Sequence, residues 1–248
     1  MTHRIAMWSG PRNLSTALMR SFGARADTMV SNEPFYGAYL RHAGNDQLMK
    51  DEVIASMDSD WQSVARTLAG PAVRPIWYQK HMAHHMAGPV DIDDLAAHTH
   101  AFLIRDPARV VASYAAKRIV VRPDDLGVAR QRAFFGRHAD RLGEAPPVVD
   151  AADILANPPV MLASLCPALG IVFDPAMLAW PAGRRKTDGL WGAHWYDAVA
   201  ASTGFGPPDT RPIRLDAAAQ AVADACRADY AYLASHRICP PKREVEPG

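Results

Sequence analysis

The sequence predicts one α/β domain with a central, mostly parallel β-sheet flanked by helices. The chain has 248 residues with an apolar content of 49%, which is enough for one large domain of this class around its own core. Short apolar runs with strand character alternate along the chain with longer segments of helical pattern. Strands that alternate with helices of this length favour parallel strands joined by helical crossovers.

The predicted elements follow one another in this alternating order. Strands are expected at 5–9, 28–31, 75–81, 100–105 and 147–150. Helices are expected between them at 13–24, 60–69, 107–118 and 124–142, and after them at 158–169 and 217–236. No repeat or linker divides the chain, so we predict a single domain over 1–248, with a flexible tail from about residue 239.

The composition argues against several classes of protein. The formal net charge is +1, so the overall charge does not point to nucleic acid or to an anionic membrane as a partner. No segment approaches the ~20 consecutive apolar residues of a membrane helix. The widely spaced Cys166, Cys226 and Cys239 form no C-x-x-C motif, which indicates a reducing compartment. With no signal-peptide pattern at the start, these observations predict a cytoplasmic protein.

The first predicted strand runs directly into a candidate anion-binding loop, since residues 5–16 read IAMWSGPRNLST. Its glycine and proline permit a sharp turn, its arginine supplies positive charge, and its serine and threonine place hydroxyls in the first helical turn. Such βα turns often present backbone N–H groups and a helix N-terminus to an anion. The alternative is an ordinary βα turn with an asparagine helix cap. The predicted site comprises Gly10, Pro11, Arg12, Asn13, Leu14, Ser15 and Thr16.

This loop lacks the glycine–lysine pair of nucleoside triphosphatases. Counting from Gly10, Ser15 stands at the second glycine position of G-x-x-x-x-G-K-[ST] and Thr16 at the lysine position. A triphosphatase needs that lysine and a bound Mg²⁺ because the transferred phosphoryl group is highly charged. A sulfuryl group carries less negative charge, so its transfer needs one cation near the bridging oxygen. Arg12 can supply that cation.

A second candidate motif follows the fourth predicted strand, in the segment FLIRDPARVVASYAAKR at 102–118. Arg105 ends the strand, Asp106 is placed to cap the next helix, and Pro107 takes its first position. Ser113 follows eight residues after Arg105, so the two side chains can converge on a second phosphate. The alternative is that Arg105 pairs with Asp106 or with a surface carboxylate.

The two motifs together resemble those of the P-loop sulfotransferases, which use 3′-phosphoadenosine-5′-phosphosulfate (PAPS). In that family a loop of the form Pro-Lys-Ser-Gly-Thr-Thr holds the 5′-phosphosulfate, and residues 11–16 are similar to it. The family's Arg-(Asn/Asp)-Pro motif and a following serine hold the 3′-phosphate, and Arg105 with Ser113 matches their spacing. A third family element, Arg-Lys-Gly-x-x-Gly-x-Trp, resembles residues 185–191, where Arg185 and Lys186 would also reach the 3′-phosphate.

The resemblance implies a P-loop sulfotransferase-like fold and transfer of a sulfuryl group from PAPS to a hydroxyl or amine of a small-molecule acceptor, without a required metal. Three departures indicate a divergent bacterial-type branch. Arg12 replaces the lysine of the cytosolic enzymes, which keeps the charge but changes its reach. Leu14 and Thr187 each stand where those enzymes carry glycine. The resemblance does not decide between a monomer and a homodimer.

Two segments compete to supply the base that takes the acceptor's proton. SNEPFYG at 31–37 places Glu33 after the second strand, where several sulfotransferase branches carry the base. WYQKHMAHHM at 77–86 follows the third strand, where the cytosolic branch has Lys-x-His with the lysine on the transferred group and the histidine as base. Lys80 and His81 are one residue closer than in that pattern. We favour Glu33, with Lys80 and His81 as the alternative.

Other interpretations of these segments stay open. Glu33 could simply begin a helix, and His81, His84 and His85 could form a polar patch or a zinc site, although no cysteine lies near them. We predict no metal site. Aromatic residues could line an acceptor pocket, stack on adenine or pack in the core, and these are Trp77, Tyr78, Trp191, Trp195 and Tyr196.

Two other functions compete with sulfuryl transfer. A P-loop kinase or related phosphotransferase is disfavoured by the missing glycine–lysine pair and by the missing acidic, metal-binding strand end. A non-catalytic protein that binds PAPS, or its product adenosine 3′,5′-bisphosphate (PAP), would keep the anion-binding motifs without turnover.

Overall fold

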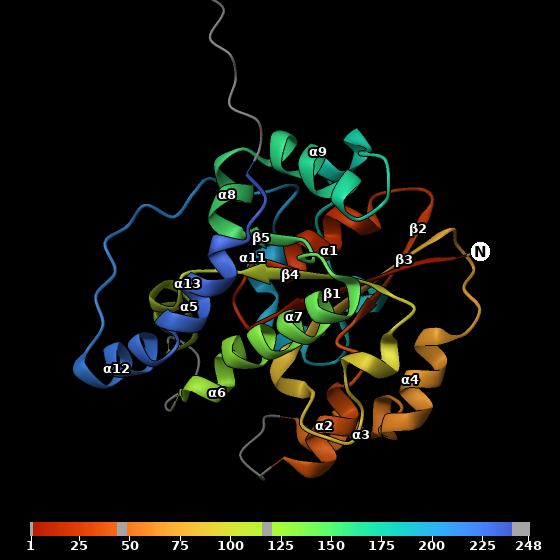
Figure 1. The fold of residues 1–248 in the computed structure, drawn as a ribbon, viewed down its shortest axis with the longest axis horizontal. Helices are drawn as coiled ribbons and strands as arrows, with labels where there is room; N and C mark the ends of the chain where they lie inside the picture. Colours follow the sequence, from red (N-terminus) through yellow and green to blue (C-terminus); the bar gives the residue numbers. More distant parts are fainter. Residues whose placement is uncertain (1, 44–48, 116–120, 240–248) are drawn as a thin grey trace, which may run out of the picture.

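A computed structural model describes residues 2–43, 49–115 and 121–239 (Figure 1). One five-stranded sheet has the order β2-β3-β1-β4-β5, and every neighbouring pair is parallel. The strands are β1 (His3–Ser9), β2 (Thr28–Asn32), β3 (Ile76–Met82), β4 (Thr99–Ile104) and β5 (Val148–Asp150). The predicted α/β class with a parallel sheet is therefore confirmed.

Helices connect the strands and cover both faces of the sheet (Figure 1). The α-helices are α1 (Ser15–Gly23), α2 (Tyr36–His42), α3 (Lys50–Ser56), α4 (Trp61–Ala69), α5 (Pro107–Ala115), α6 (Pro123–Leu126), α7 (Val128–Leu142), α8 (Ala151–Ala156), α9 (Pro158–Ala168), α10 (Gly192–Trp195), α11 (Asp197–Ala200), α12 (Ala217–Ala225) and α13 (Arg227–Ser235). Short 3₁₀ segments are η1 (Ala83–His85), η2 (Ile92–Leu95), η3 (Pro175–Leu178) and η4 (Lys186–Asp188).

Several predicted helices differ from those in the structure. The segment expected at 124–142 is divided into α6 and α7 because Gly127 adopts φ +68°, outside the helical range. The helix expected at 217–236 is two helices that meet at Cys226. The end of the helix predicted at 107–118, and the predicted tail beyond residue 239, lie outside the described residues.

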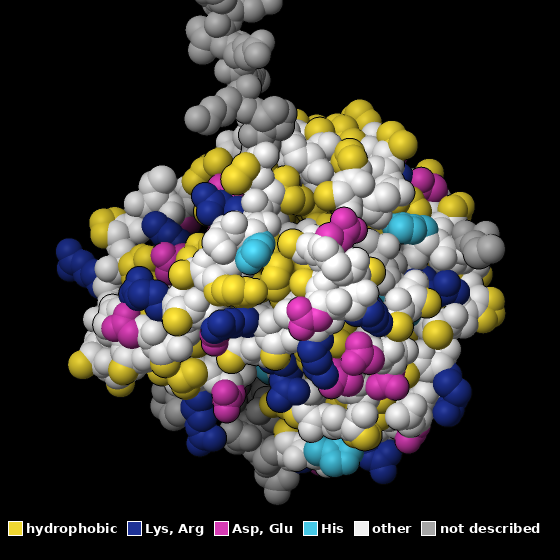
Figure 2. Space-filling model, viewed as in Figure 1, with side chains coloured by type: hydrophobic (Ala, Val, Ile, Leu, Met, Phe, Trp, Pro, Cys, Tyr) yellow, Lys and Arg dark blue, Asp and Glu magenta, His cyan; other side chains and the backbone are white. Residues whose placement is uncertain are grey.

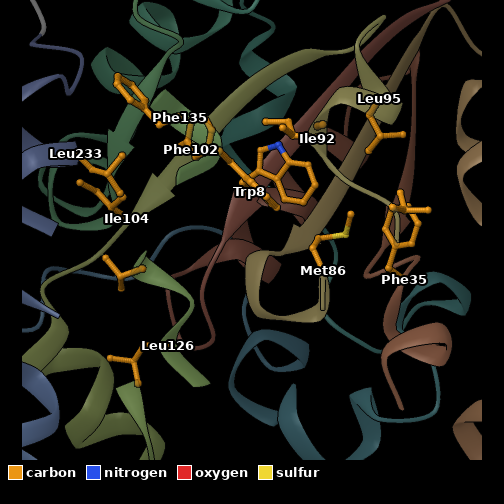
Figure 3. Close-up of a cluster of buried hydrophobic side chains, with 14 of the residues drawn as sticks. Trp8, Phe35, Met86, Ile92, Leu95, Phe102, Ile104, Leu126, Phe135 and Leu233 are labelled. Carbon is orange, nitrogen blue, oxygen red and sulfur yellow. The ribbon is translucent and has the colours of Figure 1, made fainter. Parts of the chain in front are cut away.

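Alternating side chains of β1 enter two separate cores on opposite faces of the sheet. Ala6 and Trp8 belong to the core that also contains residues of α4, α7 and α13. Ile5 and Met7 belong to the core that contains residues of α1 and α9. Trp8 lies in the middle of the part of the first core drawn in Figure 3. Because β1 is buried on both faces, its sequence is a nearly continuous apolar run.

The carboxyl ends of four strands come together at one edge of the sheet. Ser9 at the end of β1 pairs in register with Met82 of β3 and with Leu103 of β4. Asn32 at the end of β2 pairs in register with Lys80. The chain that leaves each strand here carries one of the predicted site segments, so the topology brings those segments to a common edge.

In the part of the chain that is described, no helix has the length and apolar character needed to cross a bilayer. On the face shown in Figure 2, basic and acidic side chains are intermixed rather than gathered by sign.

The backbone of Leu126 approaches Gly10 so closely that this position has no room for a side chain. A Cβ at this position would lie 2.2 Å from the carbonyl oxygen of Leu126. We expect Gly10→Ala to lower the free energy of unfolding by about 1–3 kcal/mol, measured by urea denaturation. Gly136→Ala is the matched control, because a Cβ there meets nothing within 4 Å and lies inside α7. The control should raise stability by about 0.5–1 kcal/mol, and equal effects of both changes would contradict this account.

We expect a group of buried histidines beside Trp8 to make the stability of the fold sensitive to acid. Trp8 donates through Nε1 to Nδ1 of His100 at 2.8 Å, and the His100 Nε2–H donates to the Leu95 carbonyl at 3.0 Å. This pattern requires neutral His100. Burial and neighbouring charged groups lower the pKa of His100 to about 3, and burial lowers the pKa of His98 to about 4.

The unfolded chain therefore binds more protons than the native chain below the ordinary histidine pKa of about 6.5. We expect full stability from these groups above that pH, and a loss as the pH falls toward 4 of up to about 1.4 kcal/mol per pH unit for each group. Urea denaturation across this range measures the slope. His100→Asn should reduce the slope by the contribution of one group and leave that of His98, and the exposed control His236→Asn should leave the slope unchanged. A wild-type slope of zero would refute the assignment.

Candidate functional site

A cavity of about 870 Å³ opens at the carboxyl edge of the sheet. Its wall combines the loop after β1, the ends of β2 and β4, the segment after β3, and parts of 191–207. The predicted site residues that line it are Pro11, Arg12, Asn13, Leu14, Ser15, Thr16, Glu33 and Arg105. A cleft at this position is where parallel α/β sheets bind ligands.

The loop after β1 presents an uncapped helix N-terminus to the cavity. The N-cap residue of α1 is Leu14, and no side chain caps the helix. Asn13 does not have the capping role considered from the sequence, because its Oδ1 accepts no hydrogen bond from the described residues. Its Nδ2 donates to the Leu103 carbonyl at 3.3 Å, which connects the loop to β4. The first-turn residues Ser15 and Thr16 line the cavity. Free N–H groups and the helix dipole make this a favourable place for an anion.

Two loop residues have left-handed backbone conformations. Arg12 has φ 59° and Leu14 has φ 68°, which are uncommon values for residues with a side chain. The value at Leu14 agrees with the glycine that related loops carry at this position, because glycine adopts such a φ without strain. Strained conformations of this kind are typical of ligand-binding segments.

Arg12 and Arg105 from the two predicted motifs meet beside this loop. Arg105 donates through Nη1 to the backbone oxygen of Arg12 at 2.7 Å, and Arg12 donates through Nε to Ser113 Oγ at 2.9 Å. Ser113 itself is not among the residues that line the cavity. Asp106 does not pair with Arg105, because its Oδ1 accepts the Ala108 N–H at 2.7 Å.

Neither Arg12 nor Arg105 forms an ion pair with any residue that the structure describes. Burial lowers the pKa of both guanidinium groups, although arginine stays protonated at any physiological pH. Two half-buried cations without a carboxylate partner are electrostatically unfavourable until an anion joins them. The arrangement therefore suits a ligand with more than one anionic group.

A buried ion pair lies at the ends of β2 and β3. Lys80 is 0% exposed and its Nζ contacts Glu33 Oε1, Asn32 Oδ1 at 2.9 Å and Tyr196 Oη at 3.0 Å. Burial would lower the pKa of Lys80, but the Glu33 carboxylate and Tyr196 outweigh it and hold that pKa above its ordinary value. Glu33 lines the cavity and Lys80 does not, so Lys80 contacts Glu33 but is itself separated from the cavity.

Tyr196 completes this polar cluster, although the sequence indicated only an aromatic residue of open role. Its hydroxyl donates to Glu33 Oε1 at 2.8 Å and accepts from Trp191 Nε1 at 3.2 Å. Burial, and then the Glu33 charge, raise the pKa of Tyr196, so the hydroxyl stays protonated and can donate. No sequence pattern could place Tyr196 here, because it lies 163 residues from Glu33 along the chain.

The histidines of β3 and of the 3₁₀ segment after it are divided between the core and the cavity. His81 is 1% exposed, stacks on Trp8 at 4.6 Å between ring centroids, and does not line the cavity. This corrects the placement expected for His81 as an alternative base. His84 and His85 do line the cavity. Because the three side chains do not face one space, they do not form the zinc site considered from the sequence.

His85 faces Glu33 without forming an ion pair. Its Nδ1 lies 3.9 Å from Glu33 Oε2. Burial, followed by the charges of His84 and Lys80, holds the pKa of His85 well below its ordinary value, so the ring is neutral. From the sequence, His85 was expected in a polar patch or a zinc site, and not beside Glu33.

The third predicted element lies beside β2. Arg185 donates to the Pro181 carbonyl at 3.0 Å, Lys186 is exposed, and neither residue lines the cavity. The element is held instead through Asp188, whose carboxylate binds Arg20 of α1 at 2.7 Å and whose carbonyl accepts from Asn32 at 2.9 Å. The structure therefore gives no support to nucleotide contacts by Arg185 and Lys186.

The chain is similar to known sulfotransferase domains in sequence and in fold. The family model described as "Sulfotransferase domain" matches residues 3–235. The sulfotransferase domain of the Synechococcus PCC 7002 olefin synthase has a similar structure, with a TM-score of 0.50, 18% identity, and coverage of 90% of this chain and 94% of that one. An identity of 18% supports a similar fold and nothing more specific.

Two curated relatives from Arabidopsis thaliana are called branched-chain-amino-acid aminotransferase-like proteins 1 and 2. Each is 33% identical to this chain over 212 residues, which is 84% of this chain but 37% of the relative. The chain thus spans little more than a third of their length. Because the family match covers nearly all of the described residues, the chain belongs to the sulfotransferase family of enzymes.

Proposed function

We propose that this chain transfers a sulfuryl group from PAPS to a hydroxyl or amine of a small-molecule acceptor. The observation that carries the proposal is the pair of half-buried arginines that have no ion-pair partner among the described residues, beside an uncapped helix N-terminus, in the same cavity as Glu33. PAPS is a substrate with a 5′-phosphosulfate and a 3′-phosphate, and such a ligand would supply the anions that these groups lack. The reaction would take place in the cytoplasm.

The roles follow from what each side chain can reach. The first turn of α1 and Arg12 would bind the 5′-phosphosulfate, and Arg105 would bind the 3′-phosphate. As the acceptor attacks sulfur, the bond from sulfur to the bridging oxygen breaks and negative charge grows on that oxygen. Arg12 would stabilise this charge, and the proposal assigns no role to a metal.

Glu33 would remove the acceptor's proton. It lines the cavity, and Lys80 and Tyr196 hold one of its carboxylate oxygens in a fixed position. A base held by bonds to buried partners needs no reorganisation when the proton moves, which favours transfer. Lys80 would act through Glu33 as a positioning residue, since it does not line the cavity.

The first test uses the 3′-phosphate. We expect PAP to bind more tightly than AMP by roughly ten- to hundredfold, because losing a charge-assisted contact costs ~1.5–3 kcal/mol. Isothermal titration calorimetry measures both affinities, and Arg105→Met should remove most of the difference. Equal binding of PAP and AMP by the wild type would show that Arg105 has another role, and tight binding of Mg²⁺–ATP would favour a kinase.

The second test separates the base from the nucleotide site. Glu33→Gln keeps the side-chain shape but removes its basicity, so turnover should fall by a factor on the order of 10²–10⁴ while PAP affinity persists. Steady-state kinetics and calorimetry measure the two effects. His81→Asn is the comparison variant, and it should lower thermal stability because His81 packs on Trp8 in the core. A Glu33→Gln enzyme with normal turnover would move the base elsewhere, and PAP binding without turnover by the wild type would favour the non-catalytic alternative.

A further inference from the structure

His85 lines the cavity, and its Nδ1 is a buried polar atom without a hydrogen-bond partner among the described residues. His85 is 4% exposed, and among the described residues no group forms a hydrogen bond to this nitrogen. An unsatisfied buried nitrogen costs free energy, and at a functional site it indicates a group that a ligand completes.

The imidazole ring of His85 is held in a fixed orientation by two aromatic neighbours. Tyr36 stacks on it with ring centroids 4.5 Å apart and an angle of 12° between the planes. Tyr39 stacks on it at 4.8 Å and 21°. All three rings line the cavity. The direction of the Nδ1 atom is therefore set before any ligand arrives.

The two carboxylate oxygens of Glu33 have different surroundings. Lys80 and Tyr196 both bind Oε1. In the described part of the chain, no hydrogen bond reaches Oε2, whose recorded neighbour is His85 Nδ1 at 3.9 Å. Oε2 is thus the oxygen that remains available for an exchangeable proton.

The distance between these two atoms suits one bridging atom. At 3.9 Å they are too far apart for a direct hydrogen bond, but a single oxygen can lie about 2.8–3.0 Å from both. A carboxylate oxygen opposite Nδ1 favours the tautomer with its proton on Nδ1, which donates toward Oε2. The bridging atom must then accept a hydrogen bond from His85 and donate one to Glu33.

We propose that His85 Nδ1 and Glu33 Oε2 bind the acceptor's hydroxyl between them, and that His85 makes the enzyme selective for alcohols and phenols over amines. This inference rests on the proposed function and narrows its acceptor. A hydroxyl oxygen has two lone pairs, so one accepts from Nδ1–H while the other attacks sulfur. A neutral amine nitrogen has one lone pair and cannot do both.

The proposed transfer involves only PAPS, the acceptor hydroxyl and Glu33. The hydroxyl oxygen forms a bond to sulfur, the bond from sulfur to the bridging oxygen of PAPS breaks, and the electron pair leaves with PAP. The hydroxyl proton passes to Glu33 Oε2. His85 keeps its proton throughout and acts as a specificity-determining donor.

The test uses pairs of acceptors that differ only at the nucleophile: phenol with aniline, and benzyl alcohol with benzylamine. His85→Phe keeps an aromatic ring for Tyr36 and Tyr39 but removes the donor. His85→Asn keeps an N–H donor near the position of Nδ1, and the exposed His236→Asn is the matched control. For each protein, kcat/KM is measured with PAPS and each acceptor, and PAP affinity is measured by calorimetry.

We expect the ratio of kcat/KM for the alcohol over the matched amine to fall about tenfold or more in His85→Phe, the usual effect of losing one hydrogen bond. The ratio should recover in His85→Asn and stay unchanged in His236→Asn. Comparing ratios removes the intrinsic difference in reactivity between alcohols and amines. PAP affinity should stay within about twofold in all variants, which also shows that each one folds.

An unchanged ratio in His85→Phe would overturn the inference, as would a wild-type preference for amines. PAP binding without turnover of either alcohol would overturn it as well. Absence of PAP binding by the wild type is a different result, because it would refute the proposed function itself.

Discussion

The buried ion pair between Glu33 and Lys80 is the interaction on which the site depends. A charge pair removed from water is unfavourable unless further hydrogen bonds compensate for its lost hydration. Asn32 and Tyr196 supply those bonds, so residues from β2, β3 and the segment after α10 must all be in place together. Removing one member of such a pair leaves a buried charge without a partner, typically at a cost of about 3–5 kcal/mol. The fold and the candidate base are therefore stabilised by the same contacts.

A second buried pair fixes the segment that carries Tyr196. Arg20 of α1 binds Asp188, and the Asp188 carbonyl accepts from Asn32. The helix α1, which begins at the loop after β1, is thus connected to the element that positions Tyr196 against Glu33. The part of the chain that resembles a third nucleotide-binding motif has a structural role here, because its basic residues Arg185 and Lys186 lie outside the cavity.

The loop after β1, which we propose as the anion-binding loop, is held in a strained conformation by contacts from other elements. Arg12 and Leu14 have positive φ angles, Arg105 binds the Arg12 carbonyl, and Asn13 binds β4. Groups that are fixed in advance lose little entropy and need little reorganisation when a ligand binds, which makes their electrostatic effect larger than that of mobile groups. The same reasoning applies to His85, whose ring is fixed between aromatic neighbours.

The order of strands and helices, and the positions of the loop after β1 and of Arg105 at the edge of the sheet, could be predicted from the sequence, because each depends on local patterns: apolar runs, turn residues, and polar residues at strand ends. The face of the sheet to which each side chain of β3 points could not be predicted from the sequence. All seven of its residues are buried, so no alternation of polar and apolar residues shows that Lys80 and His81 face opposite sides of the sheet. Tyr196 and His85 could not be assigned either, since their contacts with Glu33 join segments distant in sequence. The sequence alone thus determined which segments reach the edge of the sheet, and tertiary packing decided which side chains enter the cavity.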